Sequence, residues 1–150
     1  MRSAIITLTW QDCDDTKEYL ESLYGQLGGD DCFYLLDNAS NAEYSDKIEQ
    51  WLEEKLPGQY KIMTLDDFVS NYTYNPAYRY IFIRSPENMG FAVANNIIFD
   101  VIKDAGFNYI TLINNDTLLS QDTLKQLFAA MGNYKEYGVM TGDIRYYSDR

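Results

Sequence analysis

The chain has 150 residues, with 23 Asp and Glu against 12 Lys and Arg, so its formal net charge is −11. This acidity excludes a protein that grips nucleic acid through its phosphates, and the absence of His excludes imidazole bases and His metal ligands. With 46% hydrophobic and 15% aromatic residues, the chain has the composition of one folded domain with a sizeable core.

Nothing in the sequence predicts a membrane span or a secreted protein. The longest apolar runs, such as residues 110–113, are far too short to cross a bilayer. The N-terminus leads directly into a strand-like run and lacks the apolar region of a signal peptide. Two cysteines, Cys13 and Cys32, do not make a disulfide framework in a chain of this length. We therefore expect reduced thiols in a cytoplasmic protein.

Short β-branched runs alternate with amphipathic helical stripes along the whole chain. The expected strands lie at residues 4–9, 32–36, 60–64, 80–83 and 109–113, and a sixth begins at 139–141. The expected helices lie at residues 15–27, 48–56, 90–105 and 124–131, most of them ended by Gly or Pro-Gly. Between residues 66 and 79 the periodicity fails, which predicts an inserted loop that holds one helical turn.

This alternation is typical of βαβ units, and it predicts an α/β domain with a mostly parallel sheet covered on both faces. Ligands of such sheets bind at the carboxyl ends of the strands. That rule selects the segments after Thr9, Leu36 and Ile113, all of which are polar. Because two of them carry an Asp soon after the strand, we expect an acidic site assembled from separate loops.

Two acidic segments have both a chemical and a structural interpretation. In Asn114-Asn115-Asp116, a carboxylate beside two amides suits Mg²⁺ or Mn²⁺, with water and nucleotide phosphates completing the shell. On spacing alone, the same residues are more typical of a turn that satisfies its own backbone and caps the next helix, because Asn-Asn-Asp is common in loops. Asp37 is open to both interpretations, as an acceptor for a base or sugar or as an Asx-turn.

The segment from Asn88 to Asn96 is a third candidate. Gly90 opens the long predicted helix, where free N–H groups and the positive end of the dipole suit an anion. Asn95 and Asn96 lie inside that helix, although Asn is a poor helix former, and this cost is mild evidence for a functional role.

Taken together, four segments resemble glycosyltransferase family 2, the GT-A nucleotide-sugar transferases, and in particular its rhamnosyltransferase-like members. The matching segments are Ile5-Ile6-Thr7-Leu8-Thr9-Trp10, Leu36-Asp37-Asn38-Ala39-Ser40, Pro86-Glu87-Asn88-Met89-Gly90-Phe91-Ala92 with Asn95-Asn96, and Leu112-Ile113-Asn114-Asn115-Asp116-Thr117. The resemblance implies a GT-A fold of three α/β/α layers over residues 1–150, as a single donor-binding domain with an insert at about 66–79.

The resemblance also implies roles for individual residues. Thr9 and Asp37 would hold a uracil or thymine base, and Asn115 would lie near the ribose. Asp116 would bind Mn²⁺ or Mg²⁺ on the diphosphate, although the first Asp of the family's metal motif is Asn114 here. The pocket-shaping segment would include Arg84, Gly90 and Asn96.

The implied reaction is inverting transfer from a UDP- or dTDP-linked sugar to a saccharide or lipid-linked acceptor. In the family the general base belongs to the acceptor-binding half, which we expect beyond Arg150, so the 150-residue chain is not expected to show full transferase activity. Such enzymes work in the cytoplasm and at the inner face of the membrane. Two alternatives stay open: a nucleotide-binding or inactive GT-A module that acts through a partner, and a phospho-receiver domain, which the Asn-rich helix start disfavours.

Overall fold

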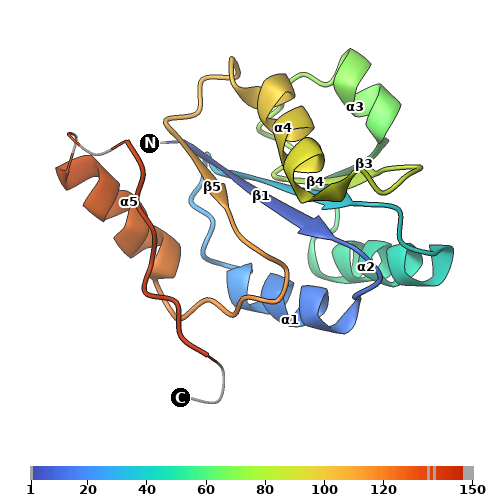
Figure 1. Ribbon diagram of the computed structural model, residues 1–150, viewed down its shortest axis with the longest axis horizontal. Coiled ribbons are helices and arrows are strands. Elements are labelled where there is room, and N and C mark those ends of the chain that lie inside the picture. The colour runs from blue at the N-terminus through green and yellow to red at the C-terminus, as the bar shows by residue number, and fades with distance from the viewer. Residues whose placement is uncertain (1, 135, 137, 147–150) are drawn as a thin grey trace.

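The computed structural model of the chain describes residues 2–134, 136 and 138–146. Within these residues, five strands form one parallel sheet in the order β3-β4-β2-β1-β5 (Figure 1). The strands are β1 (Ser3–Thr9), β2 (Cys32–Asp37), β3 (Tyr60–Thr64), β4 (Tyr80–Arg84) and β5 (Tyr109–Leu112). All residues of β2 are buried, because it lies in the middle of a sheet that is covered on both faces. In contrast, β5 lies at one edge and pairs with β1 alone.

Helices cover both faces of this sheet, which gives the molecule three layers (Figure 1). They are α1 (Asp14–Leu23), α2 (Ala42–Lys55), α3 (Leu65–Asn71), α4 (Gly90–Ile102) and α5 (Thr123–Asn133). One buried cluster contains side chains of α1, α2 and α5, and a second cluster contains side chains of α3 and α4. The predicted α/β fold with a parallel sheet between helical layers is therefore confirmed.

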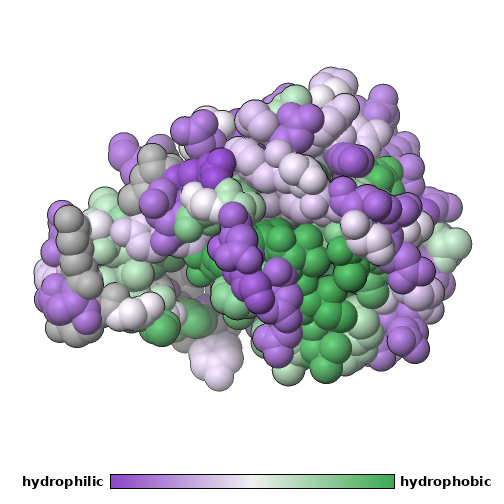
Figure 2. All heavy atoms as spheres, turned by 90° about the horizontal axis from the view of Figure 1, so that it is seen from above, coloured by the Kyte–Doolittle hydropathy of each residue, from purple (hydrophilic) through white to green (hydrophobic). Residues whose placement is uncertain are grey.

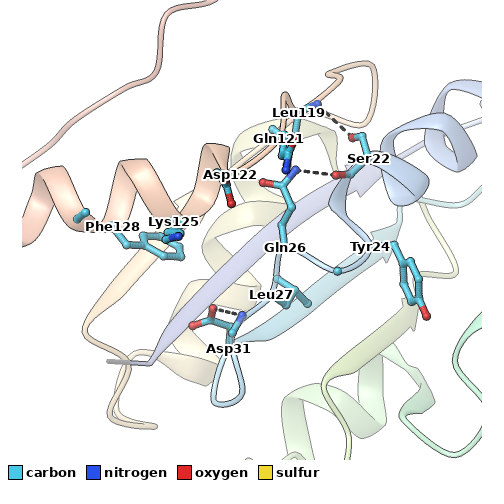
Figure 3. A pocket seen from close by; sticks show the side chains of 13 residues that line it. Ser22, Tyr24, Gln26, Leu27, Asp31, Leu119, Gln121, Asp122, Lys125 and Phe128 are labelled. Atoms are coloured by element: carbon cyan, nitrogen blue, oxygen red, sulfur yellow. Dashed lines mark hydrogen bonds between the residues drawn. The ribbon is translucent and has the colours of Figure 1, made fainter.

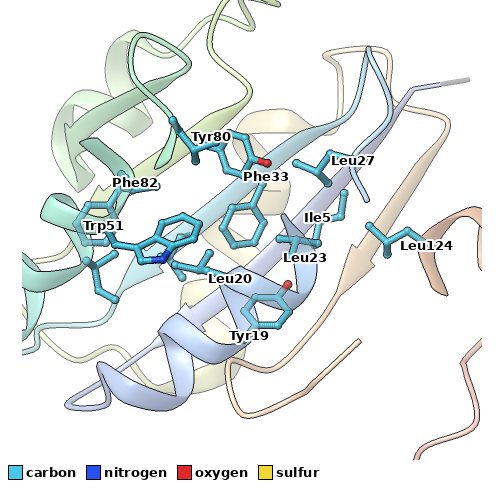
Figure 4. Close-up of a cluster of buried hydrophobic side chains, with 14 of the residues drawn as sticks. Ile5, Tyr19, Leu20, Leu23, Leu27, Phe33, Trp51, Tyr80, Phe82 and Leu124 are labelled. Atoms are coloured by element: carbon cyan, nitrogen blue, oxygen red, sulfur yellow. The ribbon is translucent and has the colours of Figure 1, made fainter. Parts of the chain in front are cut away.

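The cluster shared with α1, α2 and α5 is built around Phe33 of β2 (Figure 4). Phe33 is 1% exposed, and its ring centroid lies 6.1 Å from that of Tyr19 and 6.0 Å from that of Tyr80. The buried hydroxyl of Tyr19 has a partner, because Thr7 Oγ1 donates to it at 3.0 Å. The aromatic rings thus supply apolar area without leaving a polar end unpaired.

The opposite cluster uses the alternate residues of the same strand, since successive side chains of a strand point to opposite faces. Tyr34 packs edge-on against Phe68 of α3, and its hydroxyl lies 2.8 Å from the hydroxyl of Tyr72. Cys32 is fully buried beside them, and both Cys13 and Cys32 are free thiols, as predicted. Burial raises the pKa of the Cys32 thiol to about 11.

This environment should make Cys32 unreactive in the folded chain. A Cys13→Ala variant keeps Cys32 as its single thiol. At pH 8, about one quarter of an ordinary thiol is in the thiolate form, but only about one part in a thousand of a thiol whose pKa is near 11. We expect almost no reaction with an aromatic disulfide reagent until urea unfolds the chain, which should then release one equivalent. Fast reaction of the folded variant, followed by absorbance, would contradict the burial of Cys32.

The outer side of α4 carries several apolar side chains beside the exposed Asn96 and Asp100. Phe91, Val93 and Phe99 are each about half exposed, and the view from above the sheet shows an apolar area on this face of the molecule (Figure 2). No helix within the described residues is both long enough and apolar enough to span a membrane.

Four elements differ from the sequence-based expectation. α2 begins at Ala42, after its Asn41 N-cap, rather than at residue 48. α1 ends at Leu23 rather than near residue 27, because Gly25 adopts a φ of +85° that helical residues do not share. The predicted insert at 66–79 begins with a helix of two turns, α3, whose Thr64 N-cap accepts from Asp67 N at 3.1 Å. The predicted strand starting at 139–141 is wrong: no strand occurs within residues 138–146, and Val139 is 89% exposed.

Candidate functional site

The predicted site residues come together at the carboxyl edge of the sheet. Thr9 ends β1 opposite Asp37, and Asp37 ends β2 opposite Arg84 of β4. The chain leaving β5 passes along the same edge, because Ile113 N donates to the Ile6 carbonyl at 3.1 Å before Asn115 and Asp116 follow. The four loops that the sequence singled out are therefore neighbours, although the first and the last are more than one hundred residues apart along the chain.

A chain of hydroxyl and amide groups joins the end of β1 to the loop after β5. Thr9 Oγ1 lies 2.8 Å from Thr16 Oγ1 of α1, and Asn115 Nδ2 donates to the same Thr16 oxygen at 3.0 Å. The Thr16 hydroxyl in turn donates to the carbonyl of Asp12. Thr9 and Asn115 are thus held in a fixed relation, with Thr16 as the common partner.

Asp37 is 3% exposed, and both oxygens of its carboxylate are hydrogen-bonded. Oδ1 accepts from Ser40 N at 2.9 Å, which is the Asx-type turn that the sequence left open, and Oδ2 accepts from the Ser45 hydroxyl of α2. Each carboxylate oxygen has a second lone pair, so the structural role leaves Asp37 able to accept a further hydrogen bond from a ligand.

Arg84 lies beside Asp37, but its guanidinium turns toward α2. Its Nη2 lies 3.1 Å from Asp46 Oδ1 and 2.6 Å from Glu49 Oε2, and its charge lies over the Phe82 ring. Within the described part of the chain, the buried Nε has no hydrogen-bond partner. Arg84 therefore brings a cation to an otherwise acidic edge, next to the candidate base-binding carboxylate.

The start of α4 is fixed by amide side chains rather than left open. Asn38 Oδ1 accepts from Met89 N at 3.0 Å, and Asn38 Nδ2 donates to Asn88 Oδ1 at 2.9 Å. Asn88 Oδ1 also accepts from Gly90 N at 2.9 Å, and Gly90 has a φ of +74° that favours glycine. From the sequence we expected free N–H groups at this helix start that could bind an anion. In the structure, the N–H groups of Met89 and Gly90 are already hydrogen-bonded.

Two asparagines inside α4 have different environments. Asn95 is buried and donates to the Phe91 carbonyl one turn earlier, so its presence in the helix has a local structural reason. Asn96 is exposed to solvent. Of this pair, only Asn96 is free to reach a ligand without breaking a bond seen in the structure.

Asp116 faces the first turns of α1 across a small hollow of about 320 Å³, lined by Asp15, Glu18, Asp116 and Leu118. The negative charge of Asp12 raises the pKa of Asp15, and the Asp12 hydrogen bond, burial, Glu18 and Asp116 add to the effect. Mutual repulsion of this kind is relieved by a cation. Among the described residues, no three Asp, Glu, Cys or His side chains form a group that could hold a metal ion. A single carboxylate such as that of Asp116 suits an Mg²⁺-type ion, which usually takes its other ligands from phosphate and water.

A larger hollow of about 800 Å³ lies elsewhere, between α5 and the turn that follows α1 (Figure 3). None of the predicted site residues lines it. Its buried carboxylate, Asp31, is already engaged, because it accepts from Ser3 N and Gly28 N at 2.8 Å each. Asp122 and Lys125 also line this hollow, but none of the four sequence motifs reaches it, so the carboxyl edge is the stronger candidate site.

Sequence reasoning missed three residues that organise this edge: Thr16, Asn38 and Ser45. Asn38 belongs to the Asp-Asn-x-Ser segment that the sequence analysis singled out. Its hydrogen-bond partner, Asn88, lies 50 residues away and could not be predicted. Thr16 and Ser45 lie within helices, where a hydroxyl gives no signal of what it contacts. Trp10, directly after Thr9, is 56% exposed and adds a large aromatic surface at this edge.

A parallel α/β sheet with helices on both faces is a fold of the doubly wound type, and in such folds ligands bind at the carboxyl ends of the strands. The sequence pattern described as glycosyl transferase family 2 matches residues 4–150. The chain therefore belongs to glycosyltransferase family 2 and is a domain of that family.

Solved structures support the same fold. The crystal structure of S. aureus TarS 1-349 is 14% identical with a TM-score of 0.58, and the match covers 90% of this chain and 33% of that one. The crystal structure of S. aureus TarS is also 14% identical, with a TM-score of 0.60 and coverage of 90% and 20%. This chain thus spans about a third or less of the structures that it matches. No curated protein matches it by sequence.

Proposed function

We propose that the carboxyl edge binds the nucleoside diphosphate of an activated sugar, UDP- or dTDP-linked, together with Mn²⁺ or Mg²⁺. The observation that carries the proposal is the placement of Asp37, buried and hydrogen-bonded, at the same edge as the exposed carboxylate of Asp116. One carboxylate is set for recognition and the other for metal binding, and Thr9 and Asn115 lie between them through Thr16.

Base recognition falls to Asp37 in this proposal. The ring N–H of uracil or thymine donates to its carboxylate, and Thr9 lies on the neighbouring strand. Cytosine has no hydrogen at the equivalent nitrogen, so it would place a lone pair against the carboxylate. Arg84, whose guanidinium is paired with Asp46 and Glu49, belongs with Gly90 and Asn96 to the segment that borders the pocket.

Asp116 is the proposed metal ligand, and Asn115 lies near the ribose. The net charge of −11 opposes the approach of a diphosphate, so a divalent ion is the natural link between the two. When bound, such an ion offsets negative charge on the leaving diphosphate. Asp116, the phosphates and water would share it.

The proposed reaction is inverting. An acceptor hydroxyl, from a saccharide or a lipid-linked sugar, attacks the anomeric carbon opposite the diphosphate, and the bond from that carbon to the diphosphate breaks. The acceptor proton passes to a general base, which we expect to be a carboxylate of an acceptor-binding half. The domain described here would supply the donor side of this reaction.

Calorimetric titration of UDP and dTDP into the chain, with and without Mn²⁺, tests the proposal. We expect binding that depends on the metal and is stronger for UDP or dTDP than for CDP. Comparing UDP with dTDP also shows which base the site prefers. Equal, metal-independent binding of all three nucleotides, or no binding of any, would contradict the proposal.

A further inference from the structure

The base-recognising carboxylate is held by a helix that no site motif includes. Ser45 lies in the first turn and a half of α2, is 6% exposed, and donates its hydroxyl hydrogen to Asp37 Oδ2. The other oxygen of Asp37 is held from the loop by Ser40 N. The plane of the carboxylate is thus fixed from two sides, one bond from the backbone and one from a side chain.

The two bonds are not equivalent. The Ser40 N–H belongs to the turn that follows β2 and forms whenever that turn forms. The Ser45 hydroxyl, in contrast, comes from a separate element, and α2 also supplies Asp46 and Glu49 to the Arg84 guanidinium. One face of α2 therefore touches both members of the Asp37–Arg84 pair, which are register partners on neighbouring strands.

We infer that Ser45 is a positioning residue for base recognition: it orients the Asp37 carboxylate so that a lone pair faces the ring N–H of uracil or thymine. The inference rests on the proposed function of the carboxyl edge. A buried carboxylate that loses one of two charge-assisted bonds can rotate about its side-chain torsion, and a rotated acceptor no longer matches a planar base. Cytosine gains nothing from the orientation, so Ser45 should matter for discrimination between bases rather than for nucleotide binding in general.

The test compares UDP and CDP binding, in Mn²⁺, by the unaltered chain and by Ser45→Ala. Ala is a better helix former than Ser and smaller, so α2 should persist. We expect the affinity for UDP to fall about tenfold, equivalent to about 1.4 kcal/mol, and the affinity for CDP to stay unchanged. Ser70→Ala, an exposed serine of α3 remote from Asp37 in the sequence, is the matched control and should change neither.

A double-mutant cycle shows whether Ser45 acts through Asp37. In an Asp37→Asn background, which has already lost the charged acceptor, Ser45→Ala should cause no further loss of UDP affinity. Thermal unfolding of each variant without ligand accompanies the titrations. If Ser45→Ala does not fold, Ser45→Cys, with a weaker donor of similar size, should give a smaller fall in UDP affinity in the same direction.

Each result decides between the two claims. Ser45→Ala or Ser45→Cys that binds UDP as tightly as the unaltered chain, or loses UDP and CDP affinity equally, would overturn the positioning role while the site stands. Additive losses in the double mutant would overturn it too. If the unaltered chain binds no nucleotide, the proposed function fails and the inference fails with it.

Discussion

Asp116→Asn should abolish the Mn²⁺-dependent part of UDP and dTDP binding. The substitution removes the negative charge of the proposed metal ligand. It leaves a side chain of nearly the same size and shape that can still form hydrogen bonds. Loss of a group that merely supports a metal ligand weakens metal binding by about 10–100-fold, so loss of the ligand itself should cost at least about 100-fold. Calorimetry with and without Mn²⁺ measures the effect directly.

The control for this result is Asp104→Asn, which removes one charge from an exposed position after α4. It changes the net charge equally and should leave nucleotide binding intact. Asp116 is itself exposed, so its replacement should not alter the thermal unfolding midpoint. Unchanged Mn²⁺-dependent binding in Asp116→Asn would remove Asp116 from the metal site.

Phe33→Ala should destabilise the fold more than any change at the site. The side chain is 1% exposed and its ring contacts those of Tyr19 and Tyr80, so truncation leaves a cavity in the middle of the sheet. Replacement of a buried Phe by Ala lowers the free energy of unfolding by about 3–5 kcal/mol. Urea unfolding, followed by circular dichroism, gives the change from the shift of the midpoint.

Phe99→Ala provides the comparison, because Phe99 is 46% exposed on the outer side of α4. It removes the same atoms, and Ala has the higher helix propensity, so we expect a change of less than about 1 kcal/mol. If the two variants unfolded at the same urea concentration, the assignment of Phe33 to the core would be wrong.

The order of strands and helices could be predicted because local periodicity and buried position agree along most of the chain. The strand expected at 60–64 matches β3, and Gly90 begins α4 as its motif indicated. The prediction of a strand at 139–141 was wrong because a short β-branched run forms a strand only where a neighbouring strand pairs with it. α3 was predicted only as a single turn within a loop, because its first turn carries Asp66 and Asp67, which are common in loops but here favour a helix N-terminus.

The candidate site was visible in sequence only as separate motifs. Parallel topology alone brings Thr9, Asp37 and Asp116 to one edge, so their proximity followed from the fold class. What could not be predicted is where side chains point: the guanidinium of Arg84 turns to Asp46 and Glu49, a contact between residues 35 and 38 positions apart. The hydroxyl of Ser45 carries no local pattern either, because its role depends on a helix docking against the end of another strand.

The two ends of the proposed site follow strands that differ in how deeply they are buried. Asp37 ends β2, the buried middle strand, whereas Asp116 follows β5, a four-residue strand with one neighbour. Local opening is cheapest where a segment has few buried contacts. If the carboxyl edge binds a nucleoside diphosphate as proposed, we expect its base end to be preformed. The entropy lost on binding should then be concentrated at the proposed metal end, where the ion and the diphosphate would order the loop that carries Asp116.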